Sequence, residues 1–343
     1  MEHLLEVRGL QTYFFLRSDI AKAVDGVSFC MTPGEMVGLV GESGSGKSVT
    51  VLSVLRLIQP PGRIVSGEVI FQGRDLLKLP ESEINKNIRG QAISMVFQNP
   101  SSCLNPVLKV GTQISRVYSV HKKSSAGEAR DRALEFLRLV QIPDPGRVMG
   151  RYPHQLSGGM SQRVMIAMAL ICEPALVIAD EPTTGLDVTV QGQILDLMRD
   201  LRHKTQAAQL LITHDLGVVA ETCDRVLIMY CGKIVEVGEV GEIYSEPLHP
   251  YTDALLRSVP DVRKDFRTTT IPGSVPDPRD PPSGCRFHPR CKRCMDVCQT
   301  EEPPLISYQN GRQVACHLFE GDSTRQNQPI SSQGEERGRD RTF

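Results

Sequence analysis

A glycine-rich stretch near the N-terminus has residue types and a spacing suited to binding phosphate: Gly41-Glu42-Ser43-Gly44-Ser45-Gly46-Lys47-Ser48. It lies between an apolar run at residues 36–40 and a run of helical character that begins at Val49, and this context makes a G-x-x-x-x-G-K-S match credible. Glycines let backbone N–H groups turn towards an anion, and the positive end of the following helix points to the same place. We expect Lys47 to reach the β- and γ-phosphates of a nucleotide and Ser48 to offer its hydroxyl to Mg²⁺.

Two acidic residues, Asp180 and Glu181, follow the apolar residues 175–179. An unbroken apolar run is typical of a buried parallel strand, and open α/β sheets bind ligands at the carboxyl ends of such strands. Asp180 suits the second acid that holds Mg²⁺ through water or Ser48. Glu181 is placed to polarise the attacking water as a general base, a role worth about 10²–10⁴-fold in rate.

Two further polar residues follow predicted strands. His214 ends the strand at residues 209–213, one strand beyond Glu181, where it can bridge the γ-phosphate and the water. Gln98 follows the apolar residues 92–97, where it can bind Mg²⁺ and touch the helical segment beyond it. Together with Glu181, these are the predicted catalytic residues.

A second glycine turn, Ser157-Gly158-Gly159, precedes a predicted helix at residues 161–172. A serine hydroxyl and two unhindered backbone N–H groups at a helix start form a second anion site. Two anion-binding helix starts and one catalytic acid suggest two chains that sandwich ATP between them.

The aromatic residues Tyr13, Phe14 and Phe15 interrupt the first predicted strands. Tyr13 and Phe14 either stack on the adenine ring or pack within the protein, and both interpretations stay open.

The remaining pattern predicts an α/β protein with a helical insertion. Alternating or continuous apolar runs predict strands, and apolar residues at helical spacing predict amphipathic helices. The predicted strands are residues 4–7, 23–29, 36–40, 67–71, 92–97, 175–179, 209–213, 225–229 and 233–237. The predicted helices are residues 49–57, 127–140, 161–172, 188–202 and 250–259.

Composition favours a soluble globular protein. Of the 343 residues 40% are hydrophobic and 23% charged, and the formal net charge of −1 gives no reason to expect a nucleic-acid partner. No apolar run is long enough to cross a bilayer, and the first residues lack the features of a signal peptide, so we expect a cytoplasmic location.

Half of the ten cysteines crowd into residues 285–316. Four thiolates can bind zinc tetrahedrally or hold an iron–sulfur cluster, whereas free thiols or a disulfide are the alternatives. The cysteines of this segment are Cys285, Cys291, Cys294, Cys298 and Cys316.

The chain resembles the ATP-binding subunit of an ABC transporter over about residues 4–244. The matches are the phosphate loop, the glutamine Gln98, the signature at residues 156–159, the acids Asp180 and Glu181, the loop ending at Asp187, and the switch His214. The resemblance implies a head-to-tail dimer that binds ATP between Ser157 of one chain and the phosphate loop of the other. It also implies that Gln98 and the helical insertion pass the motion to a membrane permease.

The C-terminal region narrows the resemblance to the ATPases of oligopeptide and dipeptide importers, a family with nickel and glutathione relatives. The matching stretches are Leu248-His249-Pro250-Tyr251-Thr252, Cys285-Arg286-Phe287-His288-Pro289-Arg290-Cys291, Glu302-Pro303-Pro304 and Val314-Ala315-Cys316-His317-Leu318. The resemblance implies a four-iron, four-sulfur cluster on Cys285, Cys291, Cys298 and Cys316, with zinc as the alternative, whereas Cys294 departs from the pattern.

The expected fold class is α/β, a P-loop NTPase core of ABC type with an antiparallel β subdomain, a helical insertion subdomain and a small C-terminal cysteine-rich metal-binding segment. The expected domains are an ATP-binding domain at residues 1–246 with the insertion at about 99–160, a C-terminal extension at 247–320, and a disordered tail at 321–343.

The resemblance implies an ATPase that uses ATP and Mg²⁺ to drive uptake of peptides or a related small solute. Its implied partners are two transmembrane permease subunits, a second related ATPase subunit and an extracytoplasmic solute-binding protein, with the chain on the cytoplasmic face of the cell membrane. Two alternatives remain: a soluble ABC ATPase that acts on nucleic acid or the ribosome, and a metal-sensing or structural module in which ATP is regulatory.

Overall fold

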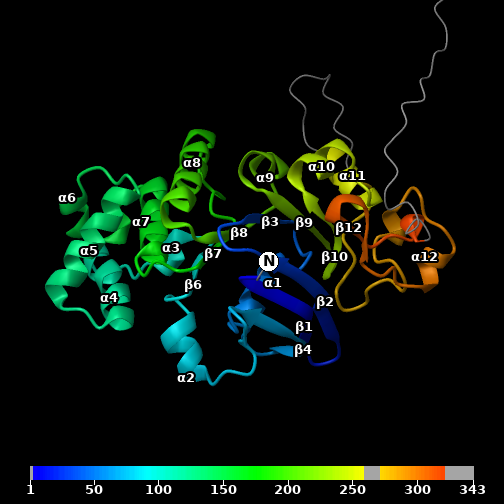
Figure 1. Ribbon diagram of the computed structural model, residues 1–343, viewed down its shortest axis with the longest axis horizontal. Helices are drawn as coiled ribbons and strands as arrows, with labels where there is room; N and C mark the ends of the chain where they lie inside the picture. The colour runs from blue at the N-terminus through cyan, green and yellow to red at the C-terminus, as the bar shows by residue number, and fades with distance from the viewer. Residues whose placement is uncertain (1–2, 259–270, 321–343) are drawn as a thin grey trace, which may run out of the picture.

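The computed structural model describes residues 3–258 and 271–320 of the chain. Two sheets occupy its middle, with a helical insertion at one end and the C-terminal segment at the other (Figure 1). The strands are β1 (Leu5–Phe15), β2 (Ile20–Met31), β3 (Met36–Val40), β4 (Gly62–Phe71), β5 (Arg74–Asp75), β6 (Ile93–Val96), β7 (Leu176–Asp180), β8 (Ala208–Thr213), β9 (Arg225–Tyr230), β10 (Lys233–Glu239), β11 (Ile306–Ser307) and β12 (Gln313–Val314). The helices are α1 (Lys47–Val54), α2 (Glu81–Glu83), α3 (Pro100–Cys103), α4 (Val110–Lys122), α5 (Ala126–Leu139), α6 (Pro145–Met149), α7 (Gly158–Leu170), α8 (Val188–Thr205), α9 (Leu216–Thr222), α10 (Val240–Ser245), α11 (Pro250–Arg257) and α12 (Val297–Thr300).

The larger sheet is eight-stranded and mixed, in the order β11-β12-β10-β9-β3-β8-β7-β6. Its strands from β9 to β6 run parallel, so the loops after β3, β6, β7 and β8 leave the sheet at one edge. This edge is where the predicted phosphate loop, Gln98, Glu181 and His214 come together. The expected α/β core of P-loop type is therefore confirmed.

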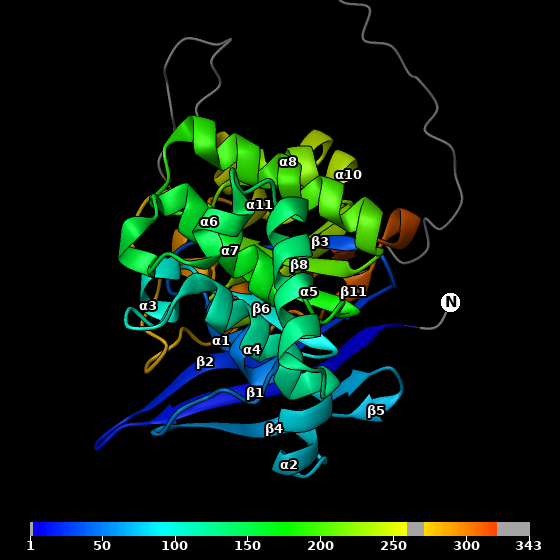
Figure 2. The same cartoon turned by 90° about the vertical axis from the view of Figure 1, so that its left-hand side faces the viewer.

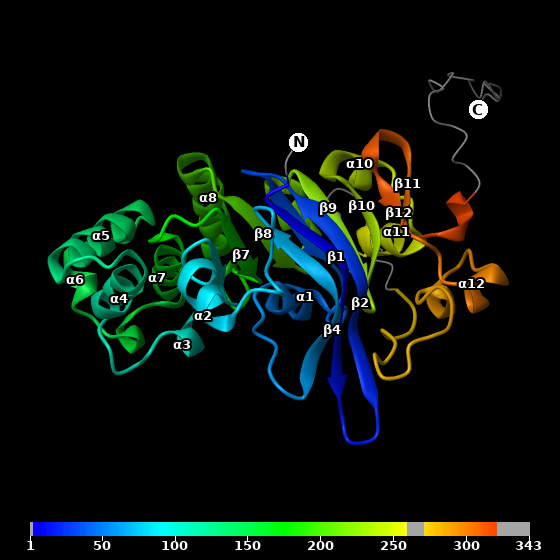
Figure 3. The ribbon, with the colours of Figure 1, turned by 60° about the horizontal axis from the view of Figure 1, so that its bottom comes forward.

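The smaller sheet is four-stranded and antiparallel, in the order β2-β1-β4-β5. Helix α1 lies between the two sheets (Figures 2 and 3), and its Val51 and Val54 are fully buried in a core to which both sheets contribute. The prediction that aromatic residues interrupt the first strand is wrong, because β1 continues through Phe15 and pairs Tyr13 with Lys22 and Phe14 with Ala21. Aromatic residues suit a half-buried strand, and bulges absorb the irregular alternation.

Residues 99–160 are mainly helical, as predicted, and contain α3 to α6. Apolar residues of α4 and α5, among them Ile114 and Leu137, share one core with helix α7 and strand β7. Helix α7 begins directly at the turn of residues 157–159 and packs against β6, so it connects the insertion to the large sheet.

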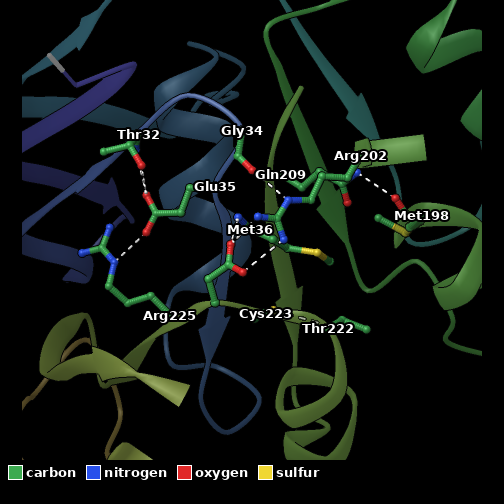
Figure 4. Close-up of polar contacts among 11 residues, drawn as sticks. Thr32, Gly34, Glu35, Met36, Met198, Arg202, Gln209, Thr222, Cys223 and Arg225 are labelled. Atoms are coloured by element: carbon green, nitrogen blue, oxygen red, sulfur yellow. Dashed lines mark hydrogen bonds and ion pairs between the residues drawn. The ribbon is translucent and has the colours of Figure 1, made fainter. Parts of the chain in front are cut away.

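A polar cluster fixes the start of β3, the strand that leads into the phosphate loop (Figure 4). Arg202 donates to the carbonyl of Gly34 at 2.7 Å, and Arg225 Nε lies 2.8 Å from Glu35 Oε1. The backbone N–H of Met36 donates to Asp224, which also pairs with Arg202 at 2.6 Å. These charge-assisted contacts hold β3 against its neighbours before it reaches the site.

The C-terminal segment belongs to the large sheet. Strand β12 pairs with β10, so that Val314 faces Glu236. Arg312 Nη2 lies 2.9 Å from Glu236 Oε1, and both side chains are buried. The backbone N–H groups of Leu248 and His249 also donate to this carboxylate, so the residues after β10 fold around one buried acid.

No helix within residues 3–258 and 271–320 is both long and apolar enough to span a membrane. The predicted helix over 250–259 appears as α11, which ends at Arg257. Its last predicted residue, Val259, and the predicted disordered tail at 321–343 lie outside the described residues.

Candidate active site

The phosphate loop joins β3 to α1, and its lysine folds back over the loop. Lys47 Nζ donates to the carbonyl oxygens of Gly41 at 2.7 Å and Glu42 at 3.0 Å. Burial lowers the pKa of Lys47, while the nearby acids, Glu181 first, oppose that shift. Because a phosphate oxygen is a stronger acceptor than a neutral carbonyl, a bound nucleotide can take over these contacts.

Two glycines of the loop are required by its packing. A Cβ at Gly41 would lie 2.1 Å from the carbonyl oxygen of Met229 on β9. Gly46 has φ +103°, and a Cβ there would lie 2.3 Å from the carbonyl oxygen of Ala23 on β2. The two strands therefore fix the shape of the loop, while Ser43 and Gly44 form its exposed tip.

Other loop residues have supporting contacts. Ser45 is fully buried and its carbonyl accepts the N–H of Gly232 at 2.8 Å, whereas Val49 packs against the core shared by the two sheets. The loop is thus joined on its inner side to the turn between β9 and β10.

Ser48 and Asp180 meet at the edge of the sheet. Ser48 Oγ donates to Asp180 Oδ1 at 3.1 Å. Burial raises the pKa of Asp180, and the neighbouring Glu181 adds to the shift, while the bond from Ser48 and the charge of Lys47 oppose it. A hydroxyl and a carboxylate are oxygen ligands of the kind that Mg²⁺ prefers, so this pair fits the predicted metal role.

Glu181 follows Asp180 in an unusual backbone conformation. Its φ is +46°, uncommon for a residue with a side chain, and its N–H donates to the carbonyl of Ile212 at 2.9 Å. Residues in such conformations concentrate at functional sites, where the surrounding structure maintains the strain. The turn directs the Glu181 carboxylate towards its three polar neighbours.

Those neighbours are Gln98, Thr184 and His214. Gln98 Nε2 donates to Glu181 Oε2 at 2.7 Å, Thr184 Oγ1 donates to the same oxygen at 3.0 Å, and His214 Nδ1 lies 3.2 Å from Oε1. Burial raises the pKa of Glu181, but the bonds from His214 and Thr184 outweigh it, so its pKa lies below the ordinary value. The Glu181 carboxylate is therefore ionised at neutral pH.

The structure brings together Lys47, Ser48, Asp180, Glu181 and, around them, Gln98 and His214, as the sequence predicts. The sequence did not identify Thr184, which carries no motif of its own. Its position three residues after the predicted base, within the same turn, is the signal that could have pointed to it.

The signature turn lies in a different part of the chain. Ser157 caps α7 by accepting the N–H of Met160 at 3.3 Å. A Cβ at Gly158 would lie 3.3 Å from Leu186, and one at Gly159 would lie 2.7 Å from Val190, so this turn packs against the start of α8. Asp187 caps that helix by accepting the N–H of Val190 at 3.0 Å. Ser157, Gly158, Gly159 and Asp187 thus form a second set at the starts of α7 and α8, whereas the lysine-bearing loop lies between β3 and α1.

The aromatic candidates for adenine have protein partners. Tyr13 donates its hydroxyl to Asp25 at 2.6 Å, and Phe14 packs beside Gly62. Both rings are only partly buried. Adenine stacking therefore stays a prediction.

Four of the cysteines line one small cavity: Cys285, Cys291, Cys298 and Cys316. Cys294 is exposed and is not among the residues that line it. Burial raises the pKa of Cys285 to about 12 and that of Cys316 to about 11. However, within residues 3–258 and 271–320 no group of three or more His, Cys, Asp or Glu residues is arranged to hold a metal ion. The predicted metal-binding segment is therefore not supported by this geometry, although the convergence of these four thiols fits the chemistry of the expected donor set.

Comparison with known families and proteins agrees with this site. A family model described as "ABC transporter" matches residues 24–184, and one described as "Oligopeptide/dipeptide transporter, C-terminal region" matches residues 235–298. The oligopeptide transport ATP-binding protein AppD of Bacillus subtilis (strain 168) is 51% identical over 328 residues, which cover 95% of this chain and 100% of AppD. The dipeptide transport ATP-binding protein DppD of Escherichia coli (strain K12) is 47% identical over 323 residues, which cover 94% of this chain and 98% of DppD.

Solved structures show the same architecture. A dimeric, post-hydrolysis structure of the ATP-binding cassette MJ0796 with ADP and Pi has a TM-score of 0.62 and 28% identity, covering 69% of this chain and 98% of that one. The protein cbiO1 from Clostridium perfringens, described as part of the ABC transporter complex cbiONQ, has a TM-score of 0.62 and 27% identity, covering 72% of this chain and 92% of that one.

Proposed function

The chain belongs to the family of ABC transporter ATP-binding proteins, in its oligopeptide/dipeptide branch, and from this premise we propose that it hydrolyses ATP to drive peptide uptake through a membrane permease. The observation that carries this proposal is the contact of an ionised Glu181 with Gln98, Thr184 and His214 beside the phosphate loop. The relatives whose names mention oligopeptide and dipeptide transport match almost the whole chain, which supports peptides as the cargo.

Catalysis rests on the position of Glu181. Its carboxylate takes the proton from the attacking water, while His214 orients the water and the γ-phosphate. Lys47 exchanges its carbonyl contacts for phosphate oxygens and offsets their charge. Bound Mg²⁺ would neutralise developing charge on the phosphates, with Ser48 and Asp180 as the residues that hold it and Gln98 as a further candidate ligand.

The complete site needs two chains. Because Ser157 and Asp187 form a set apart from Lys47, an ATP held by one loop can meet Ser157 of a second subunit. The solved relative that is described as dimeric supports this arrangement. We expect the second subunit to be a related ATPase, so that the pair is a heterodimer.

An apolar groove between β6 and the helical insertion is the proposed site for the permease. Its volume is about 260 Å³, and its lining includes Met95, Phe97, Met165 and Met168. Methionine side chains adapt to the shape of an inserted apolar helix. Gln98 follows Phe97 directly, so a permease helix in this groove would act on a residue that contacts Glu181. With two permease subunits as partners, the chain would lie on the cytoplasmic face of the membrane, and an extracytoplasmic solute-binding protein would deliver the peptide.

For the C-terminal segment we propose a four-iron, four-sulfur cluster on Cys285, Cys291, Cys298 and Cys316, with zinc as the alternative. The described thiols do not form a ready ligand set, and the proposal rests on all four lining one cavity. Such a group would supply free energy to a segment that has few apolar residues of its own. The raised pKa values of Cys285 and Cys316 mean that these thiols must lose protons when they become ligands.

Two measurements test the function. Purified protein should hydrolyse ATP only when Mg²⁺ is present, and Lys47→Met should lose this activity while Lys78→Met, a change at an exposed lysine, should keep it. Cells that lack the chain should recover uptake of labelled peptides with the wild type and with Lys78→Met, but not with Lys47→Met. ATP hydrolysis without recovery of peptide uptake would overturn the proposal that peptides are the cargo. A salt-sensitive affinity for DNA or RNA would favour the alternative of an ATPase that acts on nucleic acid or the ribosome.

A further inference from the structure

The C-terminal segment reaches the phosphate loop through an arginine. Arg290 Nη1 lies 2.7 Å from Glu42 Oε2, and Nη2 lies 3.1 Å from Glu42 Oε1, which is a two-pronged ion pair. The Arg290 side chain is 5% exposed and that of Glu42 is 26% exposed. Because Glu42 is the second residue of the loop, a residue far along the chain directly contacts the element that binds phosphate.

Arg290 is fixed from its other side. Its Nε donates to the carbonyl of Pro272 at 2.8 Å, and its Nη1 also donates to the hydroxyl of Tyr230 at 3.2 Å. The planar guanidinium lies over the Tyr230 ring, 5.8 Å from its centroid. An arginine held in this way presents its fork to Glu42 with little loss of entropy.

The backbone of Glu42 is held as well. Its N–H donates to the hydroxyl of Tyr251 at 3.0 Å. Tyr251 is fully buried in α11 and packs against Tyr230 and Phe287, with ring centroids 4.6 Å and 5.3 Å away. Residues that follow the ATPase core thus hold both the side chain and the main chain of one loop residue.

A second arginine of the same segment supports the loop from beneath. Arg286 is buried, pairs with Asp25, and donates to the carbonyl of Cys231. The next residue, Gly232, donates its N–H to Ser45 of the loop at 2.8 Å. The segment therefore contacts the loop directly through Arg290 and indirectly through the turn between β9 and β10.

We propose that Arg290 is a positioning residue of the ATP site, which neutralises Glu42 and holds it, so that the phosphate loop is ordered before the triphosphate arrives. An unpaired Glu42 carboxylate would repel the polyphosphate and would be free to move the carbonyl that Lys47 contacts. The Arg290–Glu42 ion pair forms in the nucleotide-free protein, so it favours the binding of the substrate and of the transition state equally. Its loss should raise KM and leave kcat nearly unchanged.

The experiment measures KM and kcat for Mg-ATP in purified Arg290→Met, Glu42→Gln and the double variant. Arg290→Met should raise KM on the order of tenfold, because contacting charges usually couple at about that level. Glu42→Gln removes the repelling charge, so it should raise KM by less than Arg290→Met does. The double variant should have a KM well below that of Arg290→Met and close to that of Glu42→Gln, a rescue that a purely structural role of Arg290 would not produce.

The matched control is Arg279→Met, which removes an arginine from an exposed ion pair with Asp277 in the same segment and should leave KM unchanged. An unchanged KM in folded Arg290→Met, or a double variant as impaired as Arg290→Met, overturns the proposal. If Arg290→Met does not fold, Arg290→Lys takes its place: it keeps the charge and loses the fork, and its smaller rise in KM should again be relieved by Glu42→Gln. The proposal rests on ATP hydrolysis at this loop, so a wild type without activity would contradict the proposed function and not the role of Arg290.

Discussion

Replacing Glu181 by glutamine should separate ATP binding from hydrolysis. Glutamine keeps one carbonyl oxygen, which can still accept from Gln98 and Thr184, as Oε2 of Glu181 does now at 2.7 and 3.0 Å. Its amide nitrogen then faces His214 Nδ1, which can accept when the ring proton is on Nε2. The geometry of the turn is therefore maintained, and the change removes only the base.

The expected loss equals the contribution of a positioned general base, about 10²–10⁴-fold in kcat. In free energy this is about 3–5 kcal/mol of transition-state stabilisation. The assay pairs steady-state phosphate release with calorimetric ATP binding, and the dissociation constant for ATP should stay close to that of the wild type.

The matched control is Glu173→Gln. Glu173 also has a positive φ, +53°, but its side chain is 65% exposed in an ion pair with Arg132, so this variant should hydrolyse ATP normally. A Glu181→Gln enzyme that binds ATP and turns over within about tenfold of the wild type would refute the role of Glu181.

Three further predictions follow from the same site and from the cysteine cavity. Burial raises the pKa of Asp180, so its charged form opposes folding, and the stability of the protein falls as pH rises from the ordinary pKa of 3.8 through the raised one. Asp180→Asn should therefore raise the Tm of the nucleotide-free protein at pH 7, with no gain below pH 3.8. The same variant should lose Mg²⁺-dependent hydrolysis. Ser157→Asp keeps a helix cap, whose loss costs about 0.5–2 kcal/mol, but places a negative charge where the phosphates of the ATP on the second subunit would bind. Size-exclusion chromatography with ATP should therefore show no closed dimer. A variant that still forms the dimer and hydrolyses ATP would contradict the sandwich arrangement. Cys285→Ser should lose iron from anaerobically purified protein, whereas Cys294→Ser should keep it, as read by metal analysis and visible absorption; equal iron in both variants would be evidence against the proposed ligand set.

Much of the candidate site at the edge of the large sheet could be predicted, because its polar residues directly follow recognisable apolar strands. Asp180 and Glu181 end β7 and His214 follows β8, and adjacent parallel strands bring their carboxyl ends together. The glycine spacing around Lys47 predicts the loop for a similar reason, since the constraint is local. The sequence therefore contained the information that places these residues.

The contacts of Glu42 could not be predicted in this way. Arg290 is 248 residues away along the chain, and nothing in its local sequence indicates its partner. Tyr251 has a helical neighbourhood that predicts α11 but not the direction of its hydroxyl. Long-range pairing of this kind depends on how the C-terminal segment packs, which a single sequence does not encode in a periodic pattern.

The strand prediction failed at the aromatic end of β1 and at two very short strands. The aromatic residues after Thr12 look like an interruption, yet bulges let β1 continue to Phe15. Strands β11 and β12 have only two residues each, Ile306–Ser307 and Gln313–Val314, which is too short for alternation to be detected. Pairing of β12 with β10 and of β11 with β12, not intrinsic preference, makes them strands.

The place of β12 in the sheet limits how this protein can be shortened or recombined. A fragment that ends after β10 would keep the carboxylate of Glu236 in the interior without Arg312, and an uncompensated buried charge costs about 3–5 kcal/mol. It would also present a bare strand edge that invites aggregation. A shortened chain that ends after β10 should therefore precipitate, and chimeras between relatives should exchange β10 and the residues through Val314 as one unit.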